Sequence, residues 1–69
     1  MNEFKIRDEY IKLGQVLKVA GLVGSGLDAK IVIQNGLVKV DGEIETSRGR
    51  KLSGGEVVSF EVEEIHIVK

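Results

Sequence analysis

Both ends of the chain alternate between apolar and polar residues, the pattern of a strand with one buried face. The apolar members are Phe4 and Ile6 near the start, and Val58, Phe60, Val62, Ile65 and Ile67 near the end. Glu63-Glu64 interrupts the second alternation, so we expect a bulge or a turn there. The sequence therefore predicts a half-buried strand at each end.

A helical spacing follows the first strand. Its apolar residues recur at i, i+3, i+4 and i+7, which places them on one side of an amphipathic helix. They are Leu13, Val16, Leu17 and Ala20. Gly21 comes next and is suited to end the helix. Asp41-Gly42 predicts a two-residue hairpin turn, and Ser53-Gly54-Gly55 predicts a turn before the last strand.

Residues 25–40 admit two interpretations. Asn35-Gly36 lies between two β-branched segments, so local propensity predicts a hairpin with a type I′ turn. Alternatively, Ser25 caps a short helix over residues 27–34 and Gly36 takes the left-handed position after it. The apolar face of that helix would hold Ala29, Val32 and Ile33, with Leu27 and Ile31 beside them. Each β-branched residue costs such a helix about 0.5 kcal/mol, which packing of a wide apolar face can offset.

Composition indicates one soluble domain, residues 1–69. The chain is 42% hydrophobic and 30% charged, which is too apolar for disorder, and it is too short for two cores. Because it has no cysteine, disulfides and thiolate metal sites are excluded. The start lacks the apolar core of a signal peptide, and no apolar run approaches the roughly 20 residues that span a bilayer. We therefore expect a cytoplasmic protein that does not enter the membrane.

The formal net charge of -1 conceals a segregation of charge along the chain. Residues 10–40 and 48–51 each sum to +3, whereas residues 1–9 sum to -1 and residues 41–45 and 52–69 to -3 each. The total argues against a general polyanion binder such as a basic tail. The separate blocks instead predict one basic face and one acidic face.

A longer pattern of glycines, apolar spacings and basic residues covers about residues 13–60. It comprises Leu13 to Gly21, Ser25-Gly26, Ala29-Lys30, Gly36, Val38 to Gly42, Arg48 to Leu52 and Gly54 to Val58. This pattern resembles the RNA-binding domain named after ribosomal small-subunit protein S-four, also called the alpha-L RNA-binding motif, and especially its small stand-alone bacterial members. The resemblance implies an α+β fold in which two short helices pack on a small, mostly antiparallel β-sheet. It selects the helical interpretation of residues 27–34.

The resemblance also implies an RNA surface made by the second helix, the loop before it and the hairpin after it. The matching positions are Ser25, Gly26, Lys30, Lys39, Asp41-Gly42, Arg48, Arg50 and Lys51. Backbone N–H groups at a helix start can receive a phosphate oxygen, and arginine forks suit phosphates or a splayed base. The implied partner is structured RNA, ribosomal or transfer-RNA-like, bound by a ribosome-associated monomer. No cofactor and no small-molecule substrate are expected.

Two positions depart from the family pattern. Many members carry arginine where this chain has Gly26, and asparagine where it has Asp41. The first change removes a phosphate contact and the second adds a repulsive charge, so a domain with weakened RNA affinity is a further hypothesis. Because both phenylalanines are expected in the core, Tyr10 is the one remaining aromatic residue. Recognition of RNA shape is therefore favoured over base stacking.

The competing functional hypothesis is a protein-interaction adaptor. Its acidic docking face would be formed by Glu56, Glu61, Glu63 and Glu64. His66, the only histidine, alternates with two core residues, so we expect it to be exposed and unable to complete a metal site. No combination of residues predicts an active site, and no enzyme activity is expected.

Overall fold

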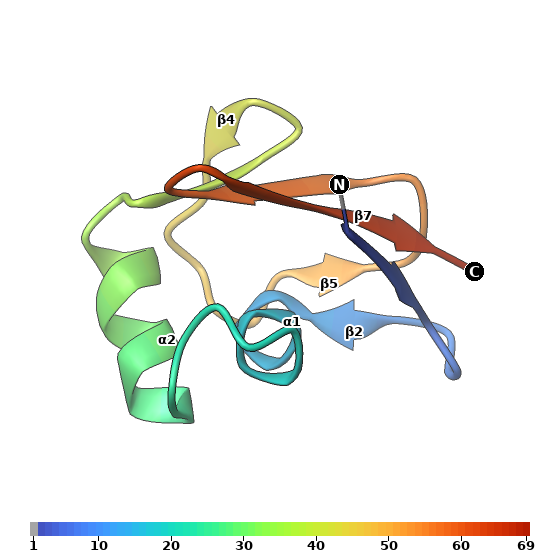
Figure 1. The fold of residues 1–69 in the computed structure, drawn as a ribbon, viewed down its shortest axis with the longest axis horizontal. Coiled ribbons are helices and arrows are strands. Elements are labelled where there is room, and N and C mark those ends of the chain that lie inside the picture. The colour runs from blue at the N-terminus through green and yellow to red at the C-terminus, as the bar shows by residue number, and fades with distance from the viewer. Residues whose placement is uncertain (1) are drawn as a thin grey trace.

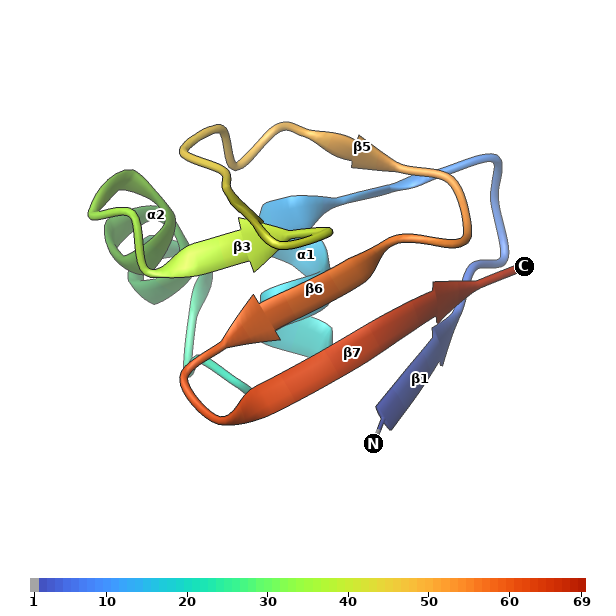
Figure 2. The same cartoon turned by 90° about the horizontal axis from the view of Figure 1, so that it is seen from above.

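Five strands form the main sheet of the computed structural model, which describes residues 2–69. They are β1 (Asn2–Lys5), β3 (Val38–Val40), β4 (Glu43–Ile44), β6 (Val57–Phe60) and β7 (Glu63–Val68). Their order across the sheet is β1-β7-β6-β3-β4, and Figure 2 shows β7 between β1 and β6. β1 runs parallel to β7, whereas every other neighbouring pair is antiparallel. The predicted mostly antiparallel sheet is confirmed.

Two helices and a small second sheet cover one face of the main sheet (Figure 1). The helices are α1 (Leu13–Val19) and α2 (Gly26–Gln34), and the second sheet pairs β2 (Ile11–Lys12) with β5 (Lys51–Leu52). This is the α+β arrangement that the family resemblance implies. Among residues 2–69, no helix is long and apolar enough to cross a bilayer.

α1 supplies the centre of the core. Its predicted apolar side is confirmed, because Leu13, Val16 and Leu17 are fully buried. Gly21 follows the helix with φ +78°, the left-handed conformation that glycine adopts readily at a helix end. The inner face of the sheet completes the core with Val38, Val40, Val58, Phe60, Ile65 and Ile67.

α2 confirms the helical interpretation of residues 27–34. The Ser25 Oγ accepts a hydrogen bond from the Asp28 N–H at 3.1 Å, and Gly36 has φ +75° beyond the helix end. The apolar face is narrower than predicted, however. Leu27 is 66% exposed and Ile31 47% exposed, because the core contacts the helix mainly through Ala29 and Ile33.

The Asp41-Gly42 turn joins β3 to β4 as predicted. Asp41 has φ +52° and Gly42 φ +85°, the positive values that a type I′ turn requires. The Asp41 Oδ1 accepts a hydrogen bond from the Val57 N–H at 2.9 Å, and the Asp41 N–H donates to the Val57 carbonyl at 2.8 Å. The aspartate therefore ties this hairpin to the start of β6.

The turn between β6 and β7 comes earlier than the sequence predicts. Glu61 has φ +56° in the turn, and Val62 beside it is 95% exposed instead of half-buried. Glu63 is already in β7, where it pairs with Phe60. A two-residue turn at this position places Ile65 opposite Val58, so both remain in the core.

His66 is half-buried, which corrects the expected exposure. It alternates with Ile65 and Ile67 and so faces away from the core, as predicted. Glu3 and Val57 are its partners on the neighbouring strands. Its Nε2 is enclosed and has no hydrogen-bond partner among residues 2–69. A central strand position is covered by its neighbours even on the open face of this sheet.

Candidate nucleic-acid interface

A hollow of about 360 Å³ lies where α1, the start of α2 and the loop before β5 meet. It is lined by Lys12, Gly14, Gln15, Lys18, Gly26, Arg48 and Gly49. Three of these residues are cations and none is acidic, and we call this site the basic hollow. Two residues of the family pattern, Gly26 and Arg48, are brought together here.

Backbone hydrogen bonds hold the loop that carries Arg48 and Arg50, which we call the arginine loop, against α1. The Gly14 N–H donates to the Arg48 carbonyl at 3.0 Å, and the Leu13 N–H donates to the Arg50 carbonyl at 2.9 Å. These donors are among those that a helix leaves unpaired in its first turn. A Cβ at Gly14 would stand 3.4 Å from the Arg48 Cβ, an ordinary van der Waals contact, so the hydrogen bonds and not the missing side chain hold the two segments together. The backbone thus fixes the loop, and the Arg48 side chain is not needed to hold it.

Lys12 and Lys18 are interface candidates that the family pattern did not identify. Lys12 immediately precedes α1 and Lys18 lies in its last turn, and both are exposed. With Gln15 they are spaced at i, i+3 and i+6, on the side of α1 away from its buried residues. The polar side of the predicted helix, together with the +3 sum of residues 10–40, could have indicated them.

The start of α2 carries a carboxylate as well as N–H groups. Ser25 caps the helix, Gly26 lines the basic hollow, and Lys30 lies one turn after Gly26 on the same side. The Asp28 carboxylate lies back over Gly24, with its Oδ2 3.3 Å from where a Cβ would stand. The cations, more than the helix N–H groups, therefore supply the positive potential of the hollow.

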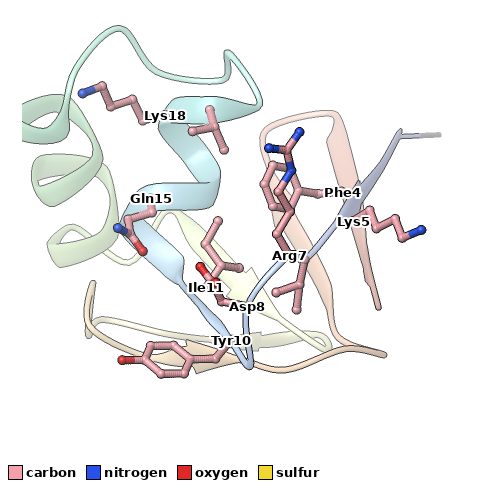
Figure 3. A pocket seen from close by; sticks show the side chains of 10 residues that line it. Phe4, Lys5, Arg7, Asp8, Tyr10, Ile11, Gln15 and Lys18 are labelled. Atoms are coloured by element: carbon pink, nitrogen blue, oxygen red, sulfur yellow. The ribbon is translucent and has the colours of Figure 1, made fainter.

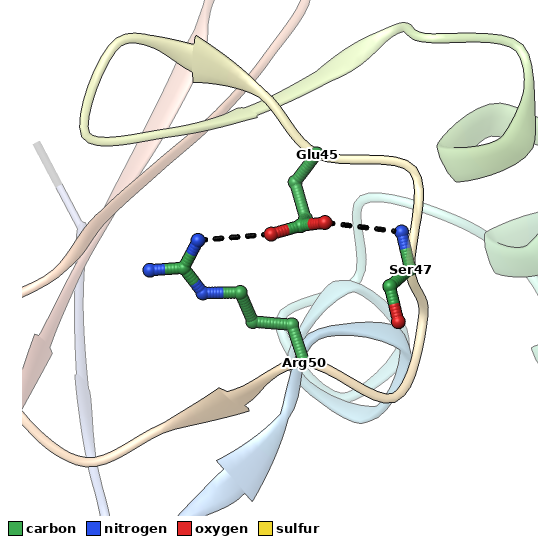
Figure 4. Close-up of polar contacts among 3 residues, drawn as sticks. All are labelled: Glu45, Ser47 and Arg50. Atoms are coloured by element: carbon green, nitrogen blue, oxygen red, sulfur yellow. Dashed lines mark hydrogen bonds and ion pairs between the residues drawn. The ribbon is translucent and has the colours of Figure 1, made fainter.

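Arg50 lies outside the basic hollow and is engaged by Glu45 (Figure 4). The Arg50 Nη1 donates to the Glu45 Oε1 at 2.9 Å, while the Glu45 Oε2 accepts from the Ser47 N–H at 3.2 Å. The side-chain hydrogen bond is the main reason that the pKa of Arg50 is raised and that the pKa of Glu45 is lowered. An RNA phosphate would have to compete with this carboxylate for Arg50.

Lys51 lies next to the basic hollow, and its ammonium group contacts an aromatic ring. Its Nζ is 4.8 Å from the centre of the Tyr10 ring, a cation–π contact. Lys51 is also the direct cross-strand partner of Lys12 between β5 and β2. Like charges in opposed positions repel each other, so the pair would be stabilised by an anion bound between or beside them.

Lys39 lies apart from the other predicted residues. Its neighbours Val38 and Val40 are buried against the helices, so Lys39 projects from the opposite face of the sheet. Its strand partners there are Ile44 and Ser59. The structure does not bring Lys39 to the basic hollow.

The acidic residues do not form one continuous face. The Glu56 carboxylate accepts hydrogen bonds from the Ser53 N–H at 2.9 Å and the Gly54 N–H at 2.8 Å. Burial by itself would raise the pKa of Glu56, but these two bonds hold it below its ordinary value. Glu61, Glu63 and Glu64 surround the turn at the other end of β6. Within residues 2–69, no three His, Asp or Glu side chains converge as metal ligands.

Comparison with known proteins identifies relatives over nearly the whole chain. A family model described as S4 domain matches residues 4–68. YbcJ of Escherichia coli (strain K12), provisionally named an RNA-binding protein, is 41% identical over 59 residues, 86% of this chain and 84% of YbcJ. RlbA of Bacillus subtilis (strain 168), named a probable ribosome maturation protein, is 43% identical over 60 residues, 87% of this chain and 84% of RlbA.

A solved structure matches the fold as well. It is the solution structure of YbcJ from E. coli, described as revealing an alpha-L motif involved in RNA binding. The TM-score is 0.77 at 37% identity, and the match covers 100% of this chain and 89% of the other. Sequence and fold therefore agree over both helices and the main sheet.

Proposed function

The chain belongs to the S4 domain family, and from that premise we propose that it binds structured RNA through the basic hollow. The observation that carries the proposal is that Lys12, Lys18 and Arg48 converge there. None of the three lies within ion-pair distance of a carboxylate among residues 2–69. Unpaired cations gathered in one place attract closely spaced negative charges, and a folded RNA backbone presents such charges.

The side chains around the hollow suit phosphate groups more than base edges. Arg48 offers a planar fork that can hold two phosphate oxygens, whereas Lys12 and Lys18 act as point charges. Lys30 extends this cationic surface along α2, and Lys51 extends it across β5. Contacts of this kind follow the geometry of a folded backbone and depend little on sequence.

The residues expected from the family pattern contribute differently to the proposal. Ser25 and Gly26 shape the start of α2, and Lys30 and Arg48 contact phosphates. Arg50 orders the arginine loop through Glu45. Lys51 strengthens the field beside Lys12. Lys39 lies on the opposite face of the sheet and makes no contact with the RNA.

The wider setting follows from the relatives. The name of RlbA connects that protein with ribosome maturation, and we extend this connection to the present chain. The RNA is then ribosomal, the setting is the cytoplasm, and the protein acts as a monomer that associates with the ribosome or its precursors. The proposal includes no catalytic step and no cofactor. An adaptor role is not favoured, since Glu56 is separated from the acidic residues that would have to act with it.

Two variants that change charge equally test the site. We expect Arg48→Glu to weaken binding to a folded ribosomal RNA fragment at least about tenfold, because it removes a phosphate contact and adds repulsion. Lys39→Glu should weaken binding less than about threefold, since only the long-range field changes. Electrophoretic mobility shift and fluorescence anisotropy measure both, and circular dichroism verifies the fold. Equal losses in the two variants would contradict the assignment to the hollow.

Salt dependence tests the electrostatic mechanism independently. About four phosphate contacts give a log-log slope of roughly -3 to -4, or on the order of a hundredfold weaker binding at about 200 mM than at about 50 mM salt. In Arg48→Glu the slope should become shallower by about 1. A response of the wild type that is flat in salt would rule out RNA binding by the hollow.

A further inference from the structure

A second hollow, of about 580 Å³, lies between β1, the connection to β2, and α1. Gln15 and Lys18 line both this hollow and the basic hollow, so the two form one continuous surface. Figure 3 shows the labelled side chains of its two walls, with Phe4 on the β1 side and Gln15 on the α1 side. We call it the aromatic hollow, because Phe4 and Tyr10 both line it.

Apolar surface in the aromatic hollow is open to solvent. Val19 is 59% exposed and Tyr10 39% exposed, and both line this one site. Phe4 was expected in the core, but it packs against the core from one side and is only half-buried. Lys51 contacts the Tyr10 ring at 4.8 Å, which orients the ring without enclosing it.

The polar residues of the aromatic hollow complement an anion. Lys5, Arg7 and Lys18 outnumber the single acid, Asp8. In Figure 3 the Arg7 side chain points into the space between β1 and α1, while Lys5 extends away from it. The Gln15 Oε1 accepts a hydrogen bond from the Lys12 N–H, and this leaves its amide N–H groups for a ligand.

We propose that the aromatic hollow receives one unpaired nucleotide of the RNA held in the basic hollow. The base lies against the Tyr10 ring, the more exposed of the two aromatic side chains, and its phosphate lies near Arg7 and Lys18. A base has two apolar faces and polar edges, and its phosphate is anionic, so one nucleotide matches both the apolar floor and the cationic rim. A base within a duplex is stacked and paired, so only an extruded nucleotide fits. This inference rests on the proposed function.

Three matched RNAs test the inference: a plain duplex, the same duplex with one bulged nucleotide, and the same duplex with an abasic bulge. The abasic RNA keeps the bend and the phosphate but lacks the base. We expect the wild type to bind the bulged nucleotide about tenfold more tightly than the abasic bulge, from stacking of one base. A 2-aminopurine at the bulge should lose fluorescence on binding, because stacking quenches it.

Variants of the protein test whether the aromatic hollow is the source of the preference for the bulged nucleotide over the abasic bulge. Tyr10→Leu should reduce the preference for the bulged base over the abasic bulge to about twofold or less, with the same variant's affinity for the plain duplex as the reference. Phe4→Leu provides a second variant, and Val62→Ala at the distant β6–β7 turn is the control that keeps the preference. If the wild type binds both bulges equally, or if both aromatic variants keep the preference, the nucleotide site is overturned while the basic hollow stands. Failure to bind any of the three RNAs would overturn both proposals.

Discussion

Gly26 is the residue at which the chain departs from the family pattern inside the proposed interface. It occupies the first position of α2 and lines the basic hollow. A Cβ at this position would meet no atom within 4 Å, and its φ lies outside the left-handed region. The position is therefore open to a side chain, and no backbone requirement explains the glycine.

Gly26→Arg should tighten RNA binding by about fivefold to tenfold, because it adds a fourth cation to the lining of the basic hollow. Its stability should be nearly unchanged, since the gain over glycine of up to about 1 kcal/mol is offset by a cation at a helix N-terminus. Gly26→Ala is the matched control: it should raise the melting temperature and leave the affinity unchanged. Anisotropy titrations and thermal denaturation measure the two effects. An unchanged affinity in the arginine variant would place the RNA elsewhere.

Glu56 gives the fold a dependence on pH. Its pKa is lowered in the folded protein, so its contribution to stability is complete above the ordinary value of about 4.5 and is lost as pH falls through the folded pKa. We expect Glu56→Gln to lower the free energy of unfolding by about 1 kcal/mol at pH 7. The glutamine side chain has a single acceptor oxygen, so it can replace only one of the two hydrogen bonds from the backbone. The difference from wild type should shrink below about pH 4. Urea denaturation at several pH values measures it, and Glu64→Gln, which changes the same charge at an exposed position in β7, is the matched reference.

At the scale of elements, α2 shows how tertiary structure decides between two local preferences. Ile31 and Ile33 would face the same side of a strand, but on a helix they lie about 200° apart. Ile33 is fully buried and Ile31 is 47% exposed. The two side chains are chemically identical, so they differ in burial alone.

Ile33→Ala should therefore destabilise the fold by about 2–5 kcal/mol, whereas Ile31→Ala should change stability by less than about 1 kcal/mol. Chemical denaturation of the two variants measures the difference. Similar losses at the two positions would favour the hairpin interpretation of residues 25–40.

The elements that could be predicted from the sequence are those whose signal is local. The i, i+3, i+4 spacing located α1, and Asp41-Gly42 located its hairpin turn. The early turn at Glu61-Val62 was missed because Val62 continues the alternation of β6, although no core residue faces it. The short pairing of β2 with β5 was missed for a different reason: two residues on each strand give too little pattern to recognise.

The candidate site likewise contains residues that the sequence indicates and residues whose role depends on the tertiary structure. Arg48 and Gly26 follow from the family pattern. The polar side of the predicted helix could have indicated Lys12 and Lys18, but their convergence with Arg48 is seen only once α1 is packed beside the arginine loop. The engagement of Arg50 by Glu45 depends on how residues 45–50 turn. Sequence spacing cannot show whether a cation in such a loop is free or paired.

At the scale of the whole molecule, the segment that carries the family pattern depends for its core on two strands outside it, β1 and β7. The pattern covers about residues 13–60, yet β7 lies between β1 and β6 and contributes Ile65 and Ile67 to the core. Ile6, which follows β1, is buried as well. We infer that residues 2–69 form one cooperative unit.

A fragment of residues 13–60 should accordingly be unfolded in isolation. Removal of β7 exposes one edge of β6 and deletes two buried side chains, each worth about 1.5–3 kcal/mol, from a domain with only about 5–10 kcal/mol of stability. Circular dichroism and the dispersion of amide NMR signals measure this, with the full chain as the reference. A cooperative unfolding transition in the fragment would contradict the inference.

The parallel pairing of β1 with β7 also sets an order of events during synthesis. β1 emerges from the ribosome before its hydrogen-bonding partner, which consists of residues 63–68. Loop closure over nearly the whole chain must precede this contact, which makes it a slow and late step of folding. Until then β1 and the residue after it, with Phe4 and Ile6 exposed, form a nascent segment that a chaperone can bind. The domain therefore completes its fold, and both hollows bordered by α1, only after translation of the last strand.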